Sequence, residues 1–419
     1  MMAKGTSIVI FLLSVLYLWA QIRAQGYADT SLAAVTAALA YVRPSPSVPA
    51  TTETASLATA RTSGSQPPVY GQDDRKPCGF SQTFNMTGQW TKSPSPSFHG
   101  FYNMTADCPP YAQDFDCQTP QKFGINDVSA AFIDSQYSQV FTPDDCALRE
   151  VDTENFNTQM AGRRLLFLGD SLMRGNWGSL ACLLRDQTVS GSSSQWAPPN
   201  TDLAPGNFTV QWGPDETRNV TKQYVGEFTL KSGGKVIIRD HSYYSQALYD
   251  AIMAEWEPLT DQDILVISYG GWYPRFVWQS DQVCWTAYKD HISHLFQDRL
   301  AKFPGRVIWK EYTPQHFGGP YGLVLGIPDD LVGKFQTECQ PADVGEFWYD
   351  DYARGLLNST CKEDCKRIQV MPIYEMTRQR PYYHGGSFGR GRTEGSADCK
   401  HYCNGMLDWW NVVLYNMLW

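Results

Sequence analysis

Short apolar runs bounded by polar residues recur at wide intervals from residue 164 onward. Four of them, at 164–168, 235–239, 263–268 and 306–312, read as strands, and a fifth candidate lies at 367–370. Continuous apolar runs suit strands that are buried on both faces, and the intervals leave room for crossover helices. The pattern therefore predicts an α/β fold, a three-layer α/β/α domain with a mainly parallel sheet.

The segments between these runs carry two further expectations. Residues 172–184 have apolar positions at helical spacing, so we expect a helix directly after the first strand. The stretch from 178 to 235 is polar and contains glycosylation signals, and we interpret it as an insertion into the domain. No internal repeat is visible.

The N-terminal region differs in composition from the rest of the chain. Residues 1–24 contain Lys4 and an apolar run of thirteen residues, 8–20, which predicts a signal peptide or a signal anchor. Membrane spans need about 17–25 apolar residues, yet a short anchor stays open as a membrane tether. Residues 25–75 are rich in Ala, Ser, Thr and Pro and predict a disordered stem. The folded domain is expected over 78–419.

The cysteines and glycosylation signals indicate an oxidising compartment. All 11 cysteines lie at Cys78 or later, which predicts a disulfide-stabilised domain with at least one unpaired thiol. Five Asn-X-Ser/Thr triplets agree with passage through the secretory pathway: Asn85, Asn103, Asn207, Asn219 and Asn358. The net charge of -9, with no basic stripe, makes nucleic acid an unsuitable partner.

The sequence "GDSLMRGNW" places Ser171 at the turn between the first predicted strand and the following helix. In open α/β sheets ligands bind beyond the carboxyl ends of the strands, where a helix N-terminus offers N–H groups. Ser171 is therefore a candidate nucleophile. The structural alternative is that Asp170 or Ser171 only caps the helix. The Gly-X-Ser-X-Gly elbow of α/β-hydrolases is not met, because Met173 stands at its second glycine.

The C-terminal stretch "SADCKHYCNG" supplies a candidate base and its orienting group. Asp398 and His401 are three residues apart, so on a helical turn the carboxylate can hold the imidazole while Nε2 faces a serine. A zinc site formed by Cys399, His401 and Cys403 is the alternative, although no second half-site matches it. A purely structural His401 also stays open.

These two motifs carry a family resemblance. Gly169-Asp170-Ser171 and Asp398-Cys399-Lys400-His401 resemble the GDS and DCxHxC signatures of the plant trichome-birefringence-like and PC-esterase proteins. The intermediate blocks "CPPYAQDFDCQ" (108–118), Cys146 and "TPQHF" (313–317) occur in the family's order. The resemblance covers about 78–419.

The resemblance implies an SGNH-hydrolase-like fold and polysaccharide O-acetyltransferase activity in the Golgi. Ser171 would be the nucleophile, His401 the general base and acid, and Asp398 its orienting residue. The acetyl donor would be acetyl-CoA or a donor derived from it. Neither a tightly bound cofactor nor a metal is expected.

The oxyanion donors are less evident from the sequence. Family members read Asn-Thr-Gly-His-Trp-Trp after the third strand, whereas residues 268–273 here read "SYGGWY". The Ser171 N–H is one candidate donor. The others are Gly270, Gly271, Arg174 and Asn176.

Further side chains are candidates for the pocket or for the core. His316 is a candidate second base, and the alternative is a loop histidine whose ring nitrogens are hydrogen-bonded by its neighbours. His384 is a candidate for positioning a sugar or an acyl donor, and the alternative is a structural turn residue. Four aromatic residues form a sugar platform or pack in the core: Trp272, Tyr273, Trp278 and Trp285. Trp409 and Trp410 are expected to pack beneath the turn of His401.

Three functions remain open on the sequence alone. The first is an acetyltransferase acting on a polysaccharide or oligosaccharide, and the second is a serine carbohydrate acetylesterase with the same triad. The third is a catalytically impaired glycan-binding relative. The expected location is the Golgi lumen, as a type II membrane protein, with a secreted protein as the alternative.

Overall fold

The computed structural model describes residues 75–92, 107–112, 139–195, 208–213, 216–220, 224–241, 244–271, 273, 281–316, 339, 348–359, 367–384 and 399–419. All of these residues belong to one compact unit, Tyr70–Trp419. The predicted signal and almost all of the predicted stem lie outside the described residues. No helix in the described ranges is both long enough and apolar enough to cross a membrane.

A seven-stranded sheet forms the centre of the domain, in the order β11-β10-β9-β3-β8-β7-β4. The first five strands in this order run parallel to their neighbours, and β7 and β4 are antiparallel. All five apolar runs identified in the sequence are strands of the parallel part. Its strands are β3 (Arg164–Gly169), β8 (Lys235–Asp240), β9 (Ile264–Ser268), β10 (Arg306–Lys310) and β11 (Ile368–Met371).

The polar stretch 178–235 is more than an insertion, and this corrects the sequence interpretation. Its first residues continue a helix, and its strands β4 (Thr188–Gln195) and β7 (Tyr224–Leu230) extend the main sheet. Strand β4 lies at the sheet edge and is rich in exposed serine, so it has no apolar run to reveal it. Only β5 (Phe208–Gly213) and β6 (Glu216–Val220) form a separate hairpin.

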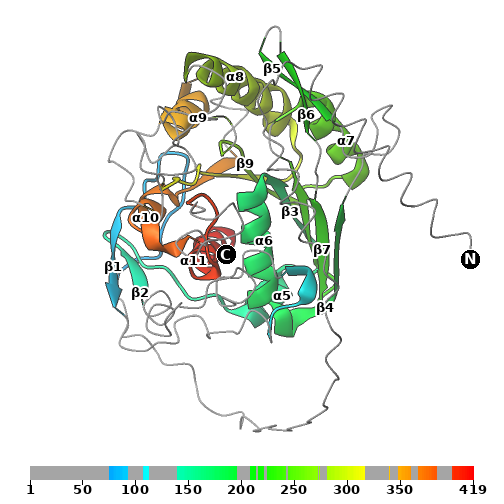
Figure 1. Ribbon diagram of the computed structural model, residues 1–419. Coiled ribbons are helices and arrows are strands. Elements are labelled where there is room, and N and C mark those ends of the chain that lie inside the picture. Colours follow the sequence, from blue (N-terminus) through cyan, green and yellow to red (C-terminus); the bar gives the residue numbers. More distant parts are fainter. Residues whose placement is uncertain are drawn as a thin grey trace, which may run out of the picture. The chain divides into compact units, whose positions relative to one another are not determined.

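Helices cover both faces of the sheet, which confirms the three-layer architecture. Along β3 the side chains alternate: Leu165 and Phe167 enter one core, while Leu166 and Leu168 enter the other. The first face is covered by α6 (Ser171–Leu183) and α11 (Asn404–Leu418). The second is covered by α7 (Gln246–Trp256), α8 (Asp281–His294) and α9 (Trp348–Ser359). Figure 1 shows α6 running along the sheet.

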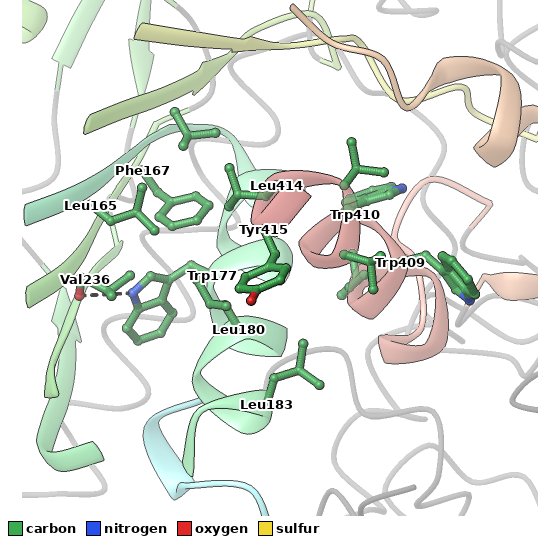
Figure 2. Close-up of a cluster of buried hydrophobic side chains, with 14 of the residues drawn as sticks. Leu165, Phe167, Trp177, Leu180, Leu183, Val236, Trp409, Trp410, Leu414 and Tyr415 are labelled. Carbon is green, nitrogen blue, oxygen red and sulfur yellow. Dashed lines mark hydrogen bonds between the residues drawn. The ribbon is translucent and has the colours of Figure 1, made fainter. Parts of the chain in front are cut away.

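Helices α6 and α11 pack against each other (Figure 2). Trp177 of α6 lies against the sheet and its indole Nε1 donates to the Val236 carbonyl at 3.4 Å, while Trp410 of α11 is fully buried. A polar seam joins the helices, since the Asn176 amide donates to Asn411 Oδ1 at 2.6 Å. The helix that begins at Ser171 is thereby fixed to the helix that follows His401.

Shorter elements complete the domain. Strands β1 (Gly88–Lys92) and β2 (Gln139–Pro143) pair antiparallel, and the short helices are α5 (Thr153–Gln159) and α10 (Tyr374–Arg378). The expected disulfide framework is confirmed by three bonds that join distant segments: Cys78–Cys146, Cys108–Cys182 and Cys339–Cys399. Cys403 is also disulfide-bonded. Cys361 and Cys365 lie outside the described residues.

Candidate active site

Ser171 lies at the carboxyl edge of the sheet, at the point where the chain leaves β3 for α6. Strand β8 lies on one side of β3 and β9 on the other, and Gly169 pairs in register with both Asp240 and Ser268. The chain enters β8 and then crosses to β9, so Ser171 lies at the topological switch point where α/β sheets bind ligands. The sequence placed the serine at this turn, and the structure confirms that placement.

The turn that carries Ser171 combines a helix cap with a close approach of two strands. Asp170 is the N-cap residue, and its Oδ1 accepts a hydrogen bond from the Leu172 N–H at 3.0 Å. At Gly169 a Cβ atom would lie 2.4 Å from the Ser268 carbonyl oxygen and 2.6 Å from Met173 Cγ. Glycine is therefore required here. Capping is performed by Asp170, which leaves the Ser171 hydroxyl for another partner.

That partner is His401. The Ser171 Oγ and His401 Nε2 atoms are 2.7 Å apart, although the residues are separated by 230 positions in the sequence. Ser171 is 9% exposed, so the hydroxyl is at the edge of a buried environment. A hydroxyl in hydrogen-bond contact with an imidazole at a helix N-terminus is the arrangement of a serine nucleophile and its base.

The alternatives for the His401 segment can now be weighed. Asp398 lies outside the described residues, so its predicted role stays a prediction. The zinc alternative is wrong, because Cys399 is bonded to Cys339 and Cys403 is also in a disulfide, which removes both thiolate ligands. Within the described ranges, no group of three or more His, Cys, Asp or Glu residues is arranged to hold a metal ion.

Gly271 adjoins the nucleophile turn, as an oxyanion candidate must. A Cβ at Gly271 would lie 2.5 Å from Asp170 Oδ2 and 3.2 Å from Lys400 Nζ. The Lys400 ammonium donates to the Gly271 carbonyl at 2.9 Å, and Gln315 Nε2 donates to it at 3.3 Å. At Gly270 a Cβ would instead meet the Tyr312 ring at 2.2 Å. Both glycines are needed for close packing, and Gly271 is the one beside Asp170.

Of the two other oxyanion candidates, Asn176 does not fit that role, and the predicted role of Arg174 stays a prediction. Asn176 is fully buried and its amide nitrogen is bonded to Asn411, in the interface between α6 and α11. Arg174 Nη1 donates to Asp240 Oδ2 at 2.8 Å, and its guanidinium lies 5.1 Å from the Tyr224 ring centroid. Helical periodicity explains the correction, because Asn176 follows Ser171 by five residues and faces a different side of α6.

Residues 148–417 match the sequence model of the PC-Esterase family, described as a "GDSL/SGNH-like Acyl-Esterase family found in Pmr5 and Cas1p". This range contains Ser171 and His401 together with all seven strands of the main sheet. The chain belongs to the PC-esterase family. The family shows that this PC-esterase has the SGNH-like fold expected from its motifs and that it is an enzyme of acyl-ester chemistry.

Several curated relatives resemble this PC-esterase along most of their length. Protein trichome birefringence-like 41 of Arabidopsis thaliana is 23% identical over 362 residues, which cover 79% of this chain and 89% of the relative. Xyloglucan O-acetyltransferase 1 of Populus trichocarpa is 22% identical, with coverage of 66% and 70%. Xyloglucan O-acetyltransferase 1 of Arabidopsis thaliana is 26% identical, with coverage of 66% and 69%.

The aromatic residues proposed as a sugar platform divide into two groups. Trp272 and Trp278 lie outside the described residues. Tyr273 is fully buried in the core of the PC-esterase domain, with its hydroxyl 2.8 Å from His291 Nδ1. Trp285 is partly buried, packs against the same core and stacks on Tyr288. Trp409 and Trp410 are buried on α11, as expected.

The two remaining histidine candidates form a buried pair. His384 is fully buried, so it does not contact a sugar or acyl donor from the pocket; its Nδ1 donates to the His401 carbonyl at 3.0 Å. His316 is also fully buried, and burial lowers its pKa to about 4, which makes it unsuitable as a second general base near neutral pH. The sequence did not predict the contact between His316 and His384 or the contact between Lys400 and Gly271. No local motif contains both residues of either contact.

Proposed function

We propose that this PC-esterase is a polysaccharide O-acetyltransferase that moves an acetyl group through Ser171 to a sugar hydroxyl in the secretory pathway. The single observation that carries the proposal is the 2.7 Å contact between Ser171 Oγ and His401 Nε2 at the switch point of the sheet. Relatives named xyloglucan O-acetyltransferase support polysaccharide acetylation as the class of reaction.

The first step acylates the enzyme. His401 Nε2 accepts the Ser171 hydroxyl proton while Oγ attacks the acetyl carbonyl of the donor, and the donor's leaving group departs with that proton. In the second step a sugar hydroxyl replaces the leaving group. It gives its proton to His401 Nε2, attacks the acetyl-serine carbonyl and releases the Ser171 hydroxyl. Asp398 is proposed as the residue that orients the imidazole.

The tetrahedral intermediate of each step carries an oxyanion that needs hydrogen-bond donors about 3 Å away. We assign this role to the Ser171 N–H at the N-terminus of α6 and to the Gly271 N–H across the turn. The helix dipole adds positive potential at the same place. The glycine beside Asp170 supports this assignment, because a side chain there would displace the turn.

The finer parts of the proposal are the acceptor, the donor and the location. A polysaccharide of the plant cell wall is proposed as the acceptor, and acetyl-CoA or a donor derived from it supplies the acetyl group. The enzyme is proposed to act in the Golgi lumen, tethered by its N-terminus, or after secretion. Disulfides in the described domain support an oxidising compartment.

Hydrolysis is the second candidate, favoured by the acyl-esterase description of the family. Water would then replace the sugar hydroxyl in the second step. The two activities differ in how well the acyl-enzyme excludes water.

The test uses the full chain with an acetyl donor and oligosaccharides from xyloglucan, xylan, mannan and pectin, read by mass spectrometry. Acetyl gained with the wild type and lost with Ser171→Ala supports a transferase and identifies its acceptor. Ser192→Ala, an exposed serine on the edge strand β4, is the matched control. Acetyl removed from pre-acetylated oligomers supports the esterase, and transfer by Ser171→Ala refutes the mechanism.

A further inference from the structure

The segment that carries His401 is held by main-chain contacts from two distant parts of the chain. The His316 N–H donates to the Cys399 carbonyl at 2.9 Å, and the Cys403 N–H donates to the Tyr383 carbonyl at 2.7 Å. His384 forms a β-bridge with Tyr402, next to His401. The backbone on both sides of His401 is therefore fixed by the segments around His316 and His384.

The side chains of the same two histidines continue this support as a chain of hydrogen bonds. His384 Nδ1 lies 3.0 Å from the carbonyl oxygen of His401 itself, and His384 Nε2 lies 2.6 Å from His316 Nδ1. His316 Nε2 lies 2.9 Å from the Arg378 carbonyl oxygen. Both rings are fully buried, so their positions are set by packing.

The chemistry of these contacts fixes the number of protons that the pair needs. A carbonyl oxygen only accepts hydrogen bonds, so His384 Nδ1 and His316 Nε2 must each carry a proton. If both rings are neutral, His384 Nε2 and His316 Nδ1 carry no hydrogen, so two lone pairs face each other across 2.6 Å. One further proton between these nitrogens completes all three hydrogen bonds and gives the pair a single positive charge.

Several groups around the pair influence this extra proton. Burial and the charge of Arg378 lower the pKa of His316, whereas its hydrogen bond to the Arg378 carbonyl raises it. The Tyr402 ring centroid lies 3.9 Å from that of His384, and the Tyr402 hydroxyl lies 3.3 Å from His316 Nδ1 while donating to the Pro314 carbonyl. The shared hydrogen bond exists only in the protonated pair, so it opposes the effect of burial.

We propose that the His316–His384 pair is a positioning device that fixes the backbone of His401 through a shared proton. The inference rests on the proposed function, in which His401 is the base for Ser171. His384 does not touch the substrate; it acts through the His401 carbonyl. The arrangement is complete when the pair is protonated, and it loses one of its three hydrogen bonds when the pH rises.

The first test compares His384→Asn and His384→Ala in the full chain. The asparagine Nδ2 takes the place of imidazole Nδ1 and keeps a donor for the His401 carbonyl, but it does not titrate. The readout is the rate at which Ser171 is labelled by a fluorophosphonate, which needs no acceptor or acetyl donor. His384→Ala should slow labelling on the order of 10²-fold, as expected when a base is misplaced by about 1 Å. His384→Asn should restore most of the rate.

The pH dependence separates positioning from a purely structural role. The ratio of the wild-type labelling rate to that of His384→Asn should fall as the pH rises through about 4, the pKa to which burial lowers His316, because only the wild type loses the shared proton. His294→Asn, in which a partly exposed histidine of α8 is changed, is the matched control and should follow the wild type. A flat ratio, or a His384→Ala variant that labels at the wild-type rate, overturns the inference.

The second test counts the protons directly and does not depend on folding of a variant or on activity. The chain has seven histidines, so ¹⁵N-histidine labelling gives a tractable NMR spectrum. Three of the four ring nitrogens of His316 and His384 should carry a proton once the pH is below about 4, the pKa of His316. Only two protonated nitrogens would overturn the shared proton. A wild type whose Ser171 resists labelling would refute the proposed function and leave this count unaffected.

Discussion

The close approach of β3 and β9 at Gly169 makes a quantitative prediction about the nucleophile. In Gly169→Ala the new Cβ would lie 2.4 Å from the Ser268 carbonyl oxygen, whereas ordinary contacts begin at 3.4 Å. The turn must therefore move by about 1 Å, since the opposing atom belongs to the backbone. A shift of this size at the Ser171–His401 contact should slow labelling of Ser171 about 100-fold. Overpacking of the core should also lower the free energy of unfolding by about 1–3 kcal/mol.

The assay combines fluorophosphonate labelling with urea unfolding of the same preparations. Gly355→Ala is the matched control, because Gly355 lies in α9 and a Cβ there meets nothing within 4 Å. This control should keep the wild-type labelling rate and gain about 0.5–1 kcal/mol from helix propensity. If Gly169→Ala labels and unfolds like the wild type, the tight junction between β3 and β9 does not position Ser171.

Three further predictions concern the support of the site. Removing the Cys339–Cys399 bond by the double change to serine should cost about 4 kcal/mol in the chain-entropy account for a separation of 60 residues, measured by urea unfolding; no change in the midpoint would contradict it. Asn411→Ala should lower the free energy of unfolding by about 1–3 kcal/mol in the same assay, because Asn176 and Ser179 lose a buried hydrogen-bond partner. Unaltered stability would show that the hydrogen bonds between α6 and α11 do not stabilise the fold. Burial lowers the pKa of Lys310 to about 7, so between about pH 7 and pH 10 the unfolded chain binds more protons than the folded chain. The free energy of unfolding should therefore rise with pH by up to about 1.4 kcal/mol per pH unit. Lys310→Met should flatten this slope in denaturation measured from about pH 7 to about pH 9, and an equal slope in both proteins would refute the lowered pKa of Lys310.

The parts of the fold that could be predicted are those in which burial on two faces leaves a continuous apolar run. Strands such as β3 and β9 are of this kind, with almost every side chain buried. Strand β7 alternates between buried and exposed positions, and β4 is a serine-rich edge strand. These two strands join the sheet by pairing with segments that are distant in sequence, and this pairing cannot be read from the amino-acid composition of the strands.

The same distinction applies to the site. Ser171 and His401 each belong to a short motif, so the sequence could propose them although 230 residues separate them. The position of Asn176 depends on which side of α6 meets α11, and the support from His384 depends on a bridge to Tyr402. Such relations arise only when the elements pack.

The most direct test of the account is to look for acetyl on Ser171. The full chain would be mixed with an acetyl donor without acceptor, quenched with acid and digested, and its peptides analysed by mass spectrometry. The account predicts acetyl on Ser171 in the wild type, its loss after an acceptor oligosaccharide is added, and none in Ser171→Ala. Acetyl transfer to the oligosaccharide by Ser171→Ala would contradict the claim that Ser171 carries the acyl group.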